Sequence, residues 1–278
     1  MTRIIIESST DLSPELKSRV TVVPLTVNFG GVEYVDGVTI DRRKFYEMLA
    51  QADVLPTTSQ GSPGDFADVF AQVRADGDTA VVLTVSSQLS GTYQSAMIAA
   101  EDYPEIHVVD TRSVAIGAGI LTEYALRLAS HGMDAERIVL SLLRARDRVR
   151  VVAMLDTLEY LKKGGRISNT TALAGSLLSI KPVVAIENGQ IVLLGKARGS
   201  RQANNLLVKE IEKAGGVDFT MPLLLGYTGL SDALLQKYIT DSAHLWEGNT
   251  DALSQTCISS VIGTHAGPGA VAVAFFKM

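Results

Sequence analysis

The chain has 278 residues and a formal net charge of -5, from 30 acidic and 25 basic side chains. This balance excludes the basic stripe that is typical of nucleic-acid-binding proteins. The single cysteine, Cys257, excludes an internal disulfide and a thiolate metal cluster. Hydrophobic residues make up 46% of the chain and aromatic residues only 6%, which indicates a protein that encloses something apolar.

The apolar runs are the size of single strands. Residues 151–155 and 271–276 are far shorter than the roughly 18 residues that a membrane-spanning helix needs. The N-terminal residues contain no apolar segment followed by a small-residue cleavage site, the pattern that marks secretion. We therefore expect a cytoplasmic protein with no membrane span.

Over residues 1–150, short β-branched runs alternate with helical patterns, which predicts a mainly parallel sheet with crossover helices. At the helix over 63–75, Ser62 stands at the N-cap, Pro63 at the first helical position and Asp65 at the third. The predicted strands are 3–7, 20–28, 79–86 and 106–110, and the predicted helices are 41–51, 63–75, 113–130 and 134–148.

A differently patterned second half begins near residue 150. We expect a smaller α/β domain over 151–278, since a chain of this length favours two domains and hence a cleft. The class is α/β throughout. The predicted strands are 150–156, 223–227, 258–262 and 271–276, with a hairpin over 182–196 that turns at Asn188-Gly189. The predicted helices are 157–163, 169–179, 200–214 and 231–243.

The loop after the strand over 79–86 is the first candidate site. Ligands of parallel sheets collect at the carboxyl ends of strands, where the next helix directs its unpaired N–H groups at the crevice. Ser90 stands at the expected N-cap, so its hydroxyl and the amides of Gly91 and Thr92 are candidate donors to a carboxylate. The alternative is that Ser90 only caps its own helix.

Two more segments carry candidate polar groups. The loop over 56–63 is rich in hydroxyl donors, among them Thr58 and Ser59, although such residues also favour plain surface turns. The glycine-rich segment over 261–270 places His265 in a turn between two predicted strands. Three roles are open for its imidazole: it donates a hydrogen bond to the same carboxylate, it acts as a base, or it only forms hydrogen bonds with neighbouring backbone groups. The other histidines, His107, His131 and His244, fall in strand or helix contexts and are expected to be structural; they have no metal-ligand spacing among them, and no metal site is predicted.

Taken together, these segments resemble the DegV family of bacterial fatty-acid-binding proteins. The similar motifs follow the family's order along the whole chain. They are Glu7-Ser8-Ser9-Thr10-Asp11-Leu12, Thr58-Ser59-Gln60, Leu89-Ser90-Gly91-Thr92-Tyr93, Val109-Asp110-Thr111, Leu161-Lys162-Lys163-Gly164-Gly165-Arg166, Ile180-Lys181-Pro182 and His265-Ala266-Gly267-Pro268-Gly269. The chain departs from the family at Glu7, where aspartate is usual, and at Gly61, where proline is frequent.

The resemblance implies a two-domain α/β fold with a long-chain fatty acid in a tunnel between the domains. The implied site residues are Thr58 and Ser90 on the carboxylate, supported by Ser59, Gly91, Thr92 and His265. The resemblance also implies a protein partner, a fatty acid kinase that phosphorylates the bound carboxylate to an acyl phosphate for phospholipid synthesis. Arg166 would meet that kinase or its phosphate, although ordinary helix C-capping also explains this segment. The fatty acid is the expected ligand, and no cofactor is expected. The resemblance is also compatible with transient contact between the protein and a membrane surface.

The physics of an acyl chain favours a carrier over an enzyme. About fourteen buried methylenes at roughly 0.8 kcal/mol each contribute on the order of 11 kcal/mol, so the tail supplies affinity and the hydroxyls supply orientation. The alternative is a serine hydrolase with Ser90 as nucleophile, His265 as base and Asp110 as orienting acid. Against the hydrolase, the sequence around Ser90 lacks the Gly-x-Ser-x-Gly motif of such enzymes. Against a self-contained kinase, the chain lacks a Gly-x4-Gly-Lys-Ser/Thr phosphate-binding loop.

Overall fold

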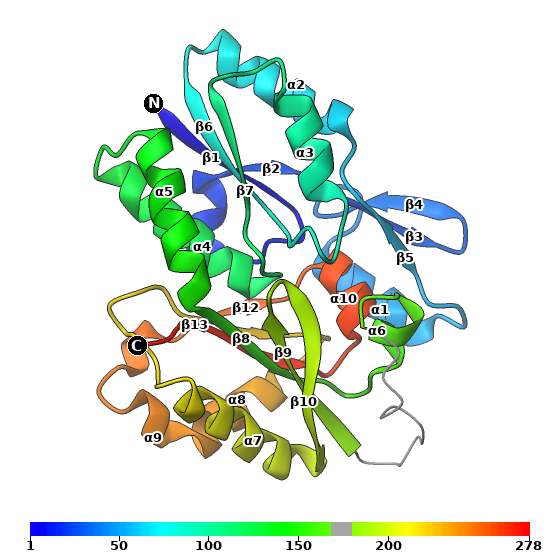
Figure 1. Ribbon diagram of the computed structural model, residues 1–278. Helices are drawn as coiled ribbons and strands as arrows, with labels where there is room; N and C mark the ends of the chain where they lie inside the picture. The colour runs from blue at the N-terminus through cyan, green and yellow to red at the C-terminus, as the bar shows by residue number, and fades with distance from the viewer. Residues whose placement is uncertain (168–179) are drawn as a thin grey trace.

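Two large sheets and one small sheet organise the described part of the chain (Figure 1). The structure, a computed structural model, describes residues 1–167 and 180–278. The helix predicted over 169–179 therefore lies outside the described residues. In the described ranges helices and strands alternate, and the predicted α/β class is confirmed.

The first sheet is parallel, with the strand order β2-β1-β6-β7. Its strands are β1 (Thr2–Glu7), β2 (Thr21–Val23), β6 (Thr79–Thr84) and β7 (Ile106–Asp110). Alternate side chains face opposite sides, so that Ile5 packs with α2 and α3, whereas Ile4 and Leu83 pack with α4 and α5. The helices are α2 (Pro63–Ala75), α3 (Thr92–Ala100), α4 (Ile116–Ser130) and α5 (Ala135–Ala145).

The second sheet is mixed and has the order β10-β9-β8-β13-β11-β12. Its strands are β8 (Val149–Met154), β9 (Ile180–Glu187), β10 (Gln190–Arg198), β11 (Leu224–Tyr227), β12 (Ser254–Cys257) and β13 (Val271–Phe276). One face packs on α7 (Gly199–Lys213), α8 (Ala233–Asp241) and α9 (Ala243–Trp246). The other face turns toward α4 and the first sheet (Figure 1).

The small third sheet is antiparallel, in the order β4-β3-β5. Its strands are β3 (Thr26–Phe29), β4 (Val32–Val35) and β5 (Thr57–Ser59). It shares a hydrophobic cluster with α1 (Arg42–Gln51) and α10 (Ser260–Ala266). The remaining described helices are α6 (Glu159–Lys163), η1 (Pro14–Arg19), η2 (Arg146–Arg148) and η4 (Thr250–Ala252).

Local chemistry explains the elements that match their predictions. At the start of α2, Ser62 Oγ accepts from the Asp65 amide at 3.2 Å, and Asp65 Oδ2 accepts from the Ser62 amide at 2.9 Å. This is the predicted capping box. The hairpin of β9 and β10 turns at Asn188 and Gly189, whose φ values of 50° and 81° fit the predicted two-residue turn.

The predicted strand over 20–28 is wrong as a single element. It is divided into β2 and β3, because Pro24 has no amide proton and interrupts the ladder. The chain leaves the first sheet at Val23 and enters the third sheet at Thr26.

The predicted strand over 258–262 is also wrong. The strand β12 ends at Cys257, and the helix α10 begins at Ser260 and ends before Gly267, which has a φ of +70°. A short apolar run does not distinguish a buried strand from a buried helix. Gly267 followed by Pro268 is compatible with the end of a helix, but the same residues also favour a turn after a strand.

The proposed domain division near residue 150 stays a proposal. One hydrophobic cluster contains Ile4 and Leu83 of the first sheet together with Val151 and Phe276 of the second. In addition, α10 belongs to the second half of the sequence but packs against α1, β3 and β5 of the first half (Figure 1). This crossing places His265 beside the third sheet.

Candidate functional site

A cavity lies where the loops at the carboxyl ends of the first sheet meet the inner face of the second sheet. Its empty volume is about 1050 Å³, part of which is open to solvent. Most of its wall is aliphatic. The apolar lining residues include Leu25, Val85, Leu89, Val114, Ile116, Val151, Leu155, Leu161, Val184, Ile186, Ile191, Ile258, Val261 and Ile262.

Small residues form the floor of this cavity. Ala153, Ala272 and Gly226 are paired in register on the adjacent strands β8, β13 and β11, and Val184 continues the row on β9. Since neighbouring strands lie about 4.8 Å apart, the row spans about 14 Å. Ala153 and Ala272 are partly exposed and line the cavity, whereas Ile258 and Ile116 pack over Gly226. The small side chains therefore leave room for an apolar ligand on β8 and β13.

Thr58 and His265 meet at the polar end of the cavity. The Thr58 Oγ1 atom on β5 lies 2.9 Å from the His265 Nε2 atom on α10, and the tautomer decides which of the two donates. Burial, and to a smaller degree the positive charge of Arg166, lowers the pKa of His265 to about 4. The imidazole is therefore neutral at neutral pH.

Ser90 also lines the cavity, from the loop that leads into α3. Its predicted N-cap position is wrong by one residue, because Ser90 N donates to Ser86 O in a closed turn and the helix starts after Gly91. Ser90 Oγ lies 2.9 Å from Thr92 Oγ1 and accepts from the Thr92 amide at 3.3 Å. Thr92 is fully buried and holds Ser90 in place rather than lining the cavity.

The other predicted residues lie around the same end. Ser59 is exposed and lines the cavity. Arg166 is half-buried on the wall, and its Nε donates to Leu89 O at 3.2 Å, in the Ser90 loop. Within the described residues, the amide of Gly91 has no hydrogen-bond partner. The structure thus brings Thr58, Ser90, Arg166 and His265 onto one cavity.

The residues of the alternative hydrolase triad do not come together. Asp110 accepts from the Ser87 hydroxyl at 2.6 Å and from the Arg112 amide at 2.8 Å. His265 bonds Thr58, and Ser90 bonds Thr92. No hydrogen bond links Ser90, His265 and Asp110 in the part of the chain that the structure describes, so the hydrolase interpretation is not supported.

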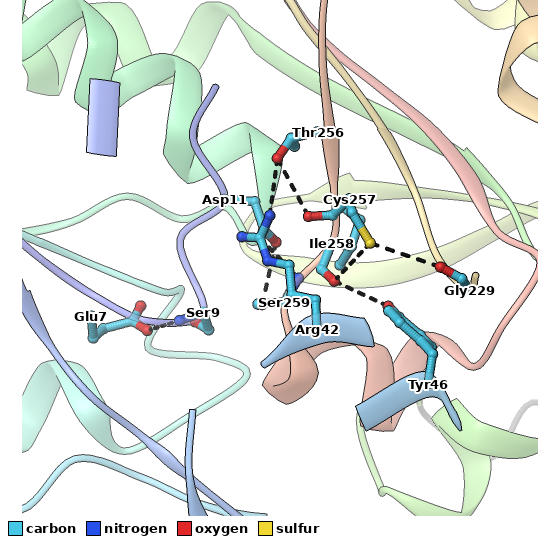
Figure 2. Close-up of polar contacts among 10 residues, drawn as sticks. All are labelled: Glu7, Ser9, Asp11, Arg42, Tyr46, Gly229, Thr256, Cys257, Ile258 and Ser259. Carbon is cyan, nitrogen blue, oxygen red and sulfur yellow. Dashed lines mark hydrogen bonds and ion pairs between the residues drawn. The ribbon is translucent and has the colours of Figure 1, made fainter. Parts of the chain in front are cut away.

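Glu7 is a buried carboxylate whose role the sequence did not reveal. Its oxygens accept from the Ser9 amide at 2.7 Å and from the Val85 amide at 2.9 Å, and Figure 2 shows the bond to Ser9. Burial raises its pKa. Glu7 therefore joins the loops that follow β1 and β6, and both loops line the cavity through Ser9 and Val85.

Asp11 is a second buried carboxylate that the sequence did not assign. Asp11 Oδ1 lies 2.8 Å from Arg42 Nη2 and accepts from the Ser259 amide at 2.9 Å (Figure 2). The Tyr46 hydroxyl donates to Ile258 O at 3.1 Å in the same region. These bonds hold the beginning of α10, whose other end carries His265. Asp11 stands four residues after the end of β1, in the segment Ser8-Ser9-Thr10-Asp11, and its sequence position alone did not reveal this role.

No helix among the described residues is both long enough and apolar enough to cross a membrane. The described histidine, cysteine, aspartate and glutamate side chains also form no group of three or more that is able to hold a metal ion.

Comparison with known proteins agrees with the resemblance that the motifs indicated. The family model described as "Uncharacterised protein, DegV family" matches residues 1–278. A DegV domain-containing protein from Caldanaerobacter subterraneus subsp. tengcongensis is 34% identical over 278 residues, which cover 98% of this chain and 97% of the relative. The chain is also similar to several solved structures over nearly their full length.

The first structure is a DegV family protein from Thermus thermophilus described by its fatty acid binding. It is 30% identical with a TM-score of 0.88, and the match covers 100% of this chain and 99% of the other. The second is a stearic-acid-binding protein from Eubacterium ventriosum, which is 28% identical with a TM-score of 0.86. Here the match covers 100% of this chain and 98% of the other.

Proposed function

The chain belongs to the DegV family, and we propose that it is a carrier that binds one long-chain fatty acid in the cavity between its sheets. In this proposal it presents the carboxylate to a partner fatty acid kinase, which converts it to an acyl phosphate. The observation that carries the proposal is the convergence of Thr58, from the strand β5, and Ser90, from the loop before α3, on one largely apolar cavity.

The wall of the cavity accounts for the tail. Aliphatic side chains and the small-residue floor offer an apolar surface and few polar partners, so each buried methylene contributes about 0.8 kcal/mol. The cost of immobilising the ligand reduces this sum without removing it. The solved structures from Thermus thermophilus and Eubacterium ventriosum, which are described as binding fatty acids, support the same ligand class.

The polar end of the cavity offers hydrogen-bond donors for the carboxylate head group of the fatty acid. The hydroxyls of Thr58 and Ser90 are half-buried donors, and the amide of Gly91, which has no partner within residues 1–167 and 180–278, lies at the positive end of α3. Neutral His265 bonds Thr58 and so keeps its hydroxyl in the cavity wall. Hydrogen bonds from neutral donors hold an ionised carboxylate in place and leave its oxygens more nucleophilic than a tight ion pair would.

The position of the head supports presentation to a partner. Ser59 and Gln60 line the same end and are exposed, so this end of the cavity reaches the protein surface. Arg166 adds a positive charge there, which suits the phosphate that a kinase would deliver. The identity of the partner as a kinase rests on the family resemblance.

The test has two stages. Mass spectrometry of an organic extract from the purified protein is expected to detect long-chain fatty acid in near-stoichiometric amount. With the cognate kinase and ATP, Thr58→Ala and Ser90→Ala are then expected to lose most acyl phosphate formation. Ser87→Ala is the matched control, because Ser87 lies in the same loop but bonds Asp110 outside the cavity wall. Full activity of both site variants would show that the head lies elsewhere.

A further inference from the structure

The segment that follows Thr58 on β5 touches the segment that follows Ser90, at Gln60 and Gly91. A Cβ atom placed on Gly91 would lie 2.1 Å from Gln60 Oε1 and 2.9 Å from Gln60 Nε2. The amide group of Gln60 therefore packs directly on the Cα atom of Gly91. Gln60 Nε2 also donates to Ser95 Oγ at 3.2 Å, one turn farther along α3.

Gly91 is needed for the space it leaves and not for its backbone conformation. Its φ of -76° and ψ of 0° are accessible to any residue. Any side chain here would displace the Gln60 amide, which is the flexible end of an exposed side chain, and would so break its bond to buried Ser95. The glycine thus permits a close contact between the loop after β5 and the start of α3.

We propose that Gln60, by packing on Gly91 and bonding Ser95, sets the separation of the Thr58 and Ser90 hydroxyls and so positions both on one fatty acid carboxylate. This inference rests on the proposed function. Gln60 is two residues after Thr58, and Gly91 directly follows Ser90, so the contact lies within two residues of both hydroxyl-bearing residues. Gln60 is a positioning residue, because it acts through the two hydroxyls.

The physical reason is the short range of hydrogen bonds. Two donors reach one carboxylate only when each oxygen pair lies within about 2.5–3.0 Å, so a small change in loop separation breaks one of them. The loops belong to different elements, the third sheet and α3, and no strand pairing links β5 to the first sheet among the described residues. The side chain of Gln60 links them directly beside the two hydroxyls, whereas the packing of α2 on α3 links them farther away.

The experiment uses the full-length protein, delipidated and reloaded with palmitate labelled with ¹³C at the carboxyl carbon. In the wild type we expect one sharp bound carboxyl resonance. In Gln60→Ala we expect this resonance to shift or broaden and the palmitate Kd to rise about tenfold, the value of a lost charge-assisted bond. Hexadecanol has the same chain and no carboxylate, and its Kd is expected to change less than twofold.

A double-mutant cycle separates positioning from independent effects. Gly91→Ala inserts a methyl group into the Gln60 amide and is expected to weaken palmitate binding about as much as Gln60→Ala. The double variant is expected to be no weaker than either single variant, since the obstructed amide is gone. Gly64→Ala is the control, because its Cβ meets only Ser62 Oγ, at 3.6 Å.

The inference is overturned if Gln60→Ala keeps both the carboxyl resonance and the palmitate affinity, or if the two single losses multiply in the double variant. An equal loss of hexadecanol and palmitate binding would also overturn it, since this would indicate general damage to the cavity. If Gly91→Ala does not fold, Ser95→Ala replaces it and is expected to shift the same resonance. Absence of bound palmitate in the wild type would instead refute the proposed function.

Discussion

The buried carboxylate of Asp11 lies 2.8 Å from the guanidinium of Arg42. The same oxygen accepts from the amide of Ser259, which is 248 residues away along the chain. Arg42 Nη1 also donates to Thr256 Oγ1 at 3.1 Å (Figure 2). Through these bonds the first loop of the protein and α1 hold the beginning of α10 and hence the helix that carries His265.

This pair predicts a pH dependence of stability. Burial raises the pKa of Asp11 to about 7, although Arg42 opposes the shift. The folded protein thus binds more protons at this site than the unfolded chain between about pH 4 and pH 7, and the site loses stability as pH rises through that window. Urea unfolding is expected to show that the wild-type free energy of unfolding, minus that of Asp11→Asn, falls from pH 5 to pH 8. A difference that is constant or rises would contradict the shifted pKa.

His265 is expected to give a pH dependence of stability with the opposite sign to that of Asp11. Its folded pKa of about 4 is below the usual histidine value of about 6.5, so the unfolded chain binds more protons between these values. Its contribution to stability is complete above about pH 6.5 and is lost as pH falls toward 4. NMR is expected to show that the His265 ring titrates near pH 4 in the folded protein and near 6.5 in urea. Titration of the folded ring near 6.5 would show that it is open to water.

A larger side chain at Ala272 is expected to shorten the acyl chain that the protein binds. A leucine there would rise from the middle of the small-residue floor, between Ala153 and Gly226, and take the space of several methylenes. Lipid extracted from Ala272→Leu is expected to be shorter on average than lipid from the wild type, by mass spectrometry. Ala71→Leu, on an exposed face of α2, controls for the substitution itself. An unchanged length distribution would place the tail away from this floor.

At Gly263 we expect a glycine-to-alanine substitution to lower the free energy of unfolding, which is the opposite of its usual effect in a helix. Glycine to alanine in a helix normally stabilises by up to about 1 kcal/mol. In α10, however, a Cβ atom on Gly263 would lie 2.6 Å from Tyr46 Oη and 2.7 Å from Phe45 Cε1. We expect Gly263→Ala to destabilise by about 1–3 kcal/mol in urea unfolding, because α10 must move off α1. A more stable variant would mean that the two helices separate at no cost.

Much of the architecture was predictable from local chemistry. The capping box at Ser62 and Asp65 marked the start of α2, and Asn188-Gly189 marked the hairpin turn. The loop of Ser90 was expected at the carboxyl end of a parallel strand, and β6 confirms that position. These signals depend only on a few neighbouring residues, so they can be recognised without knowledge of the rest of the fold.

The helix α10 was not predictable in this way. The apolar run over 258–262 fits a buried strand as well as a helix, and the sequence alone favoured the strand. Its conformation depends on partners distant in sequence: Asp11 accepts from the Ser259 amide, and α1 packs against Gly263. Local propensity carries no information about an acceptor 248 residues away.

The sequence by itself determined the α/β class and the mainly parallel first sheet, and it selected Thr58, Ser90 and His265 as candidate site residues. Only the tertiary structure decided that Thr58 bonds His265, that Gln60 packs on Gly91, and that Ala153, Ala272 and Gly226 share one row. The physical reason is that residue type and local spacing set the conformation of each segment. Contacts between segments depend instead on how whole sheets pack, and packing is a property of the complete fold.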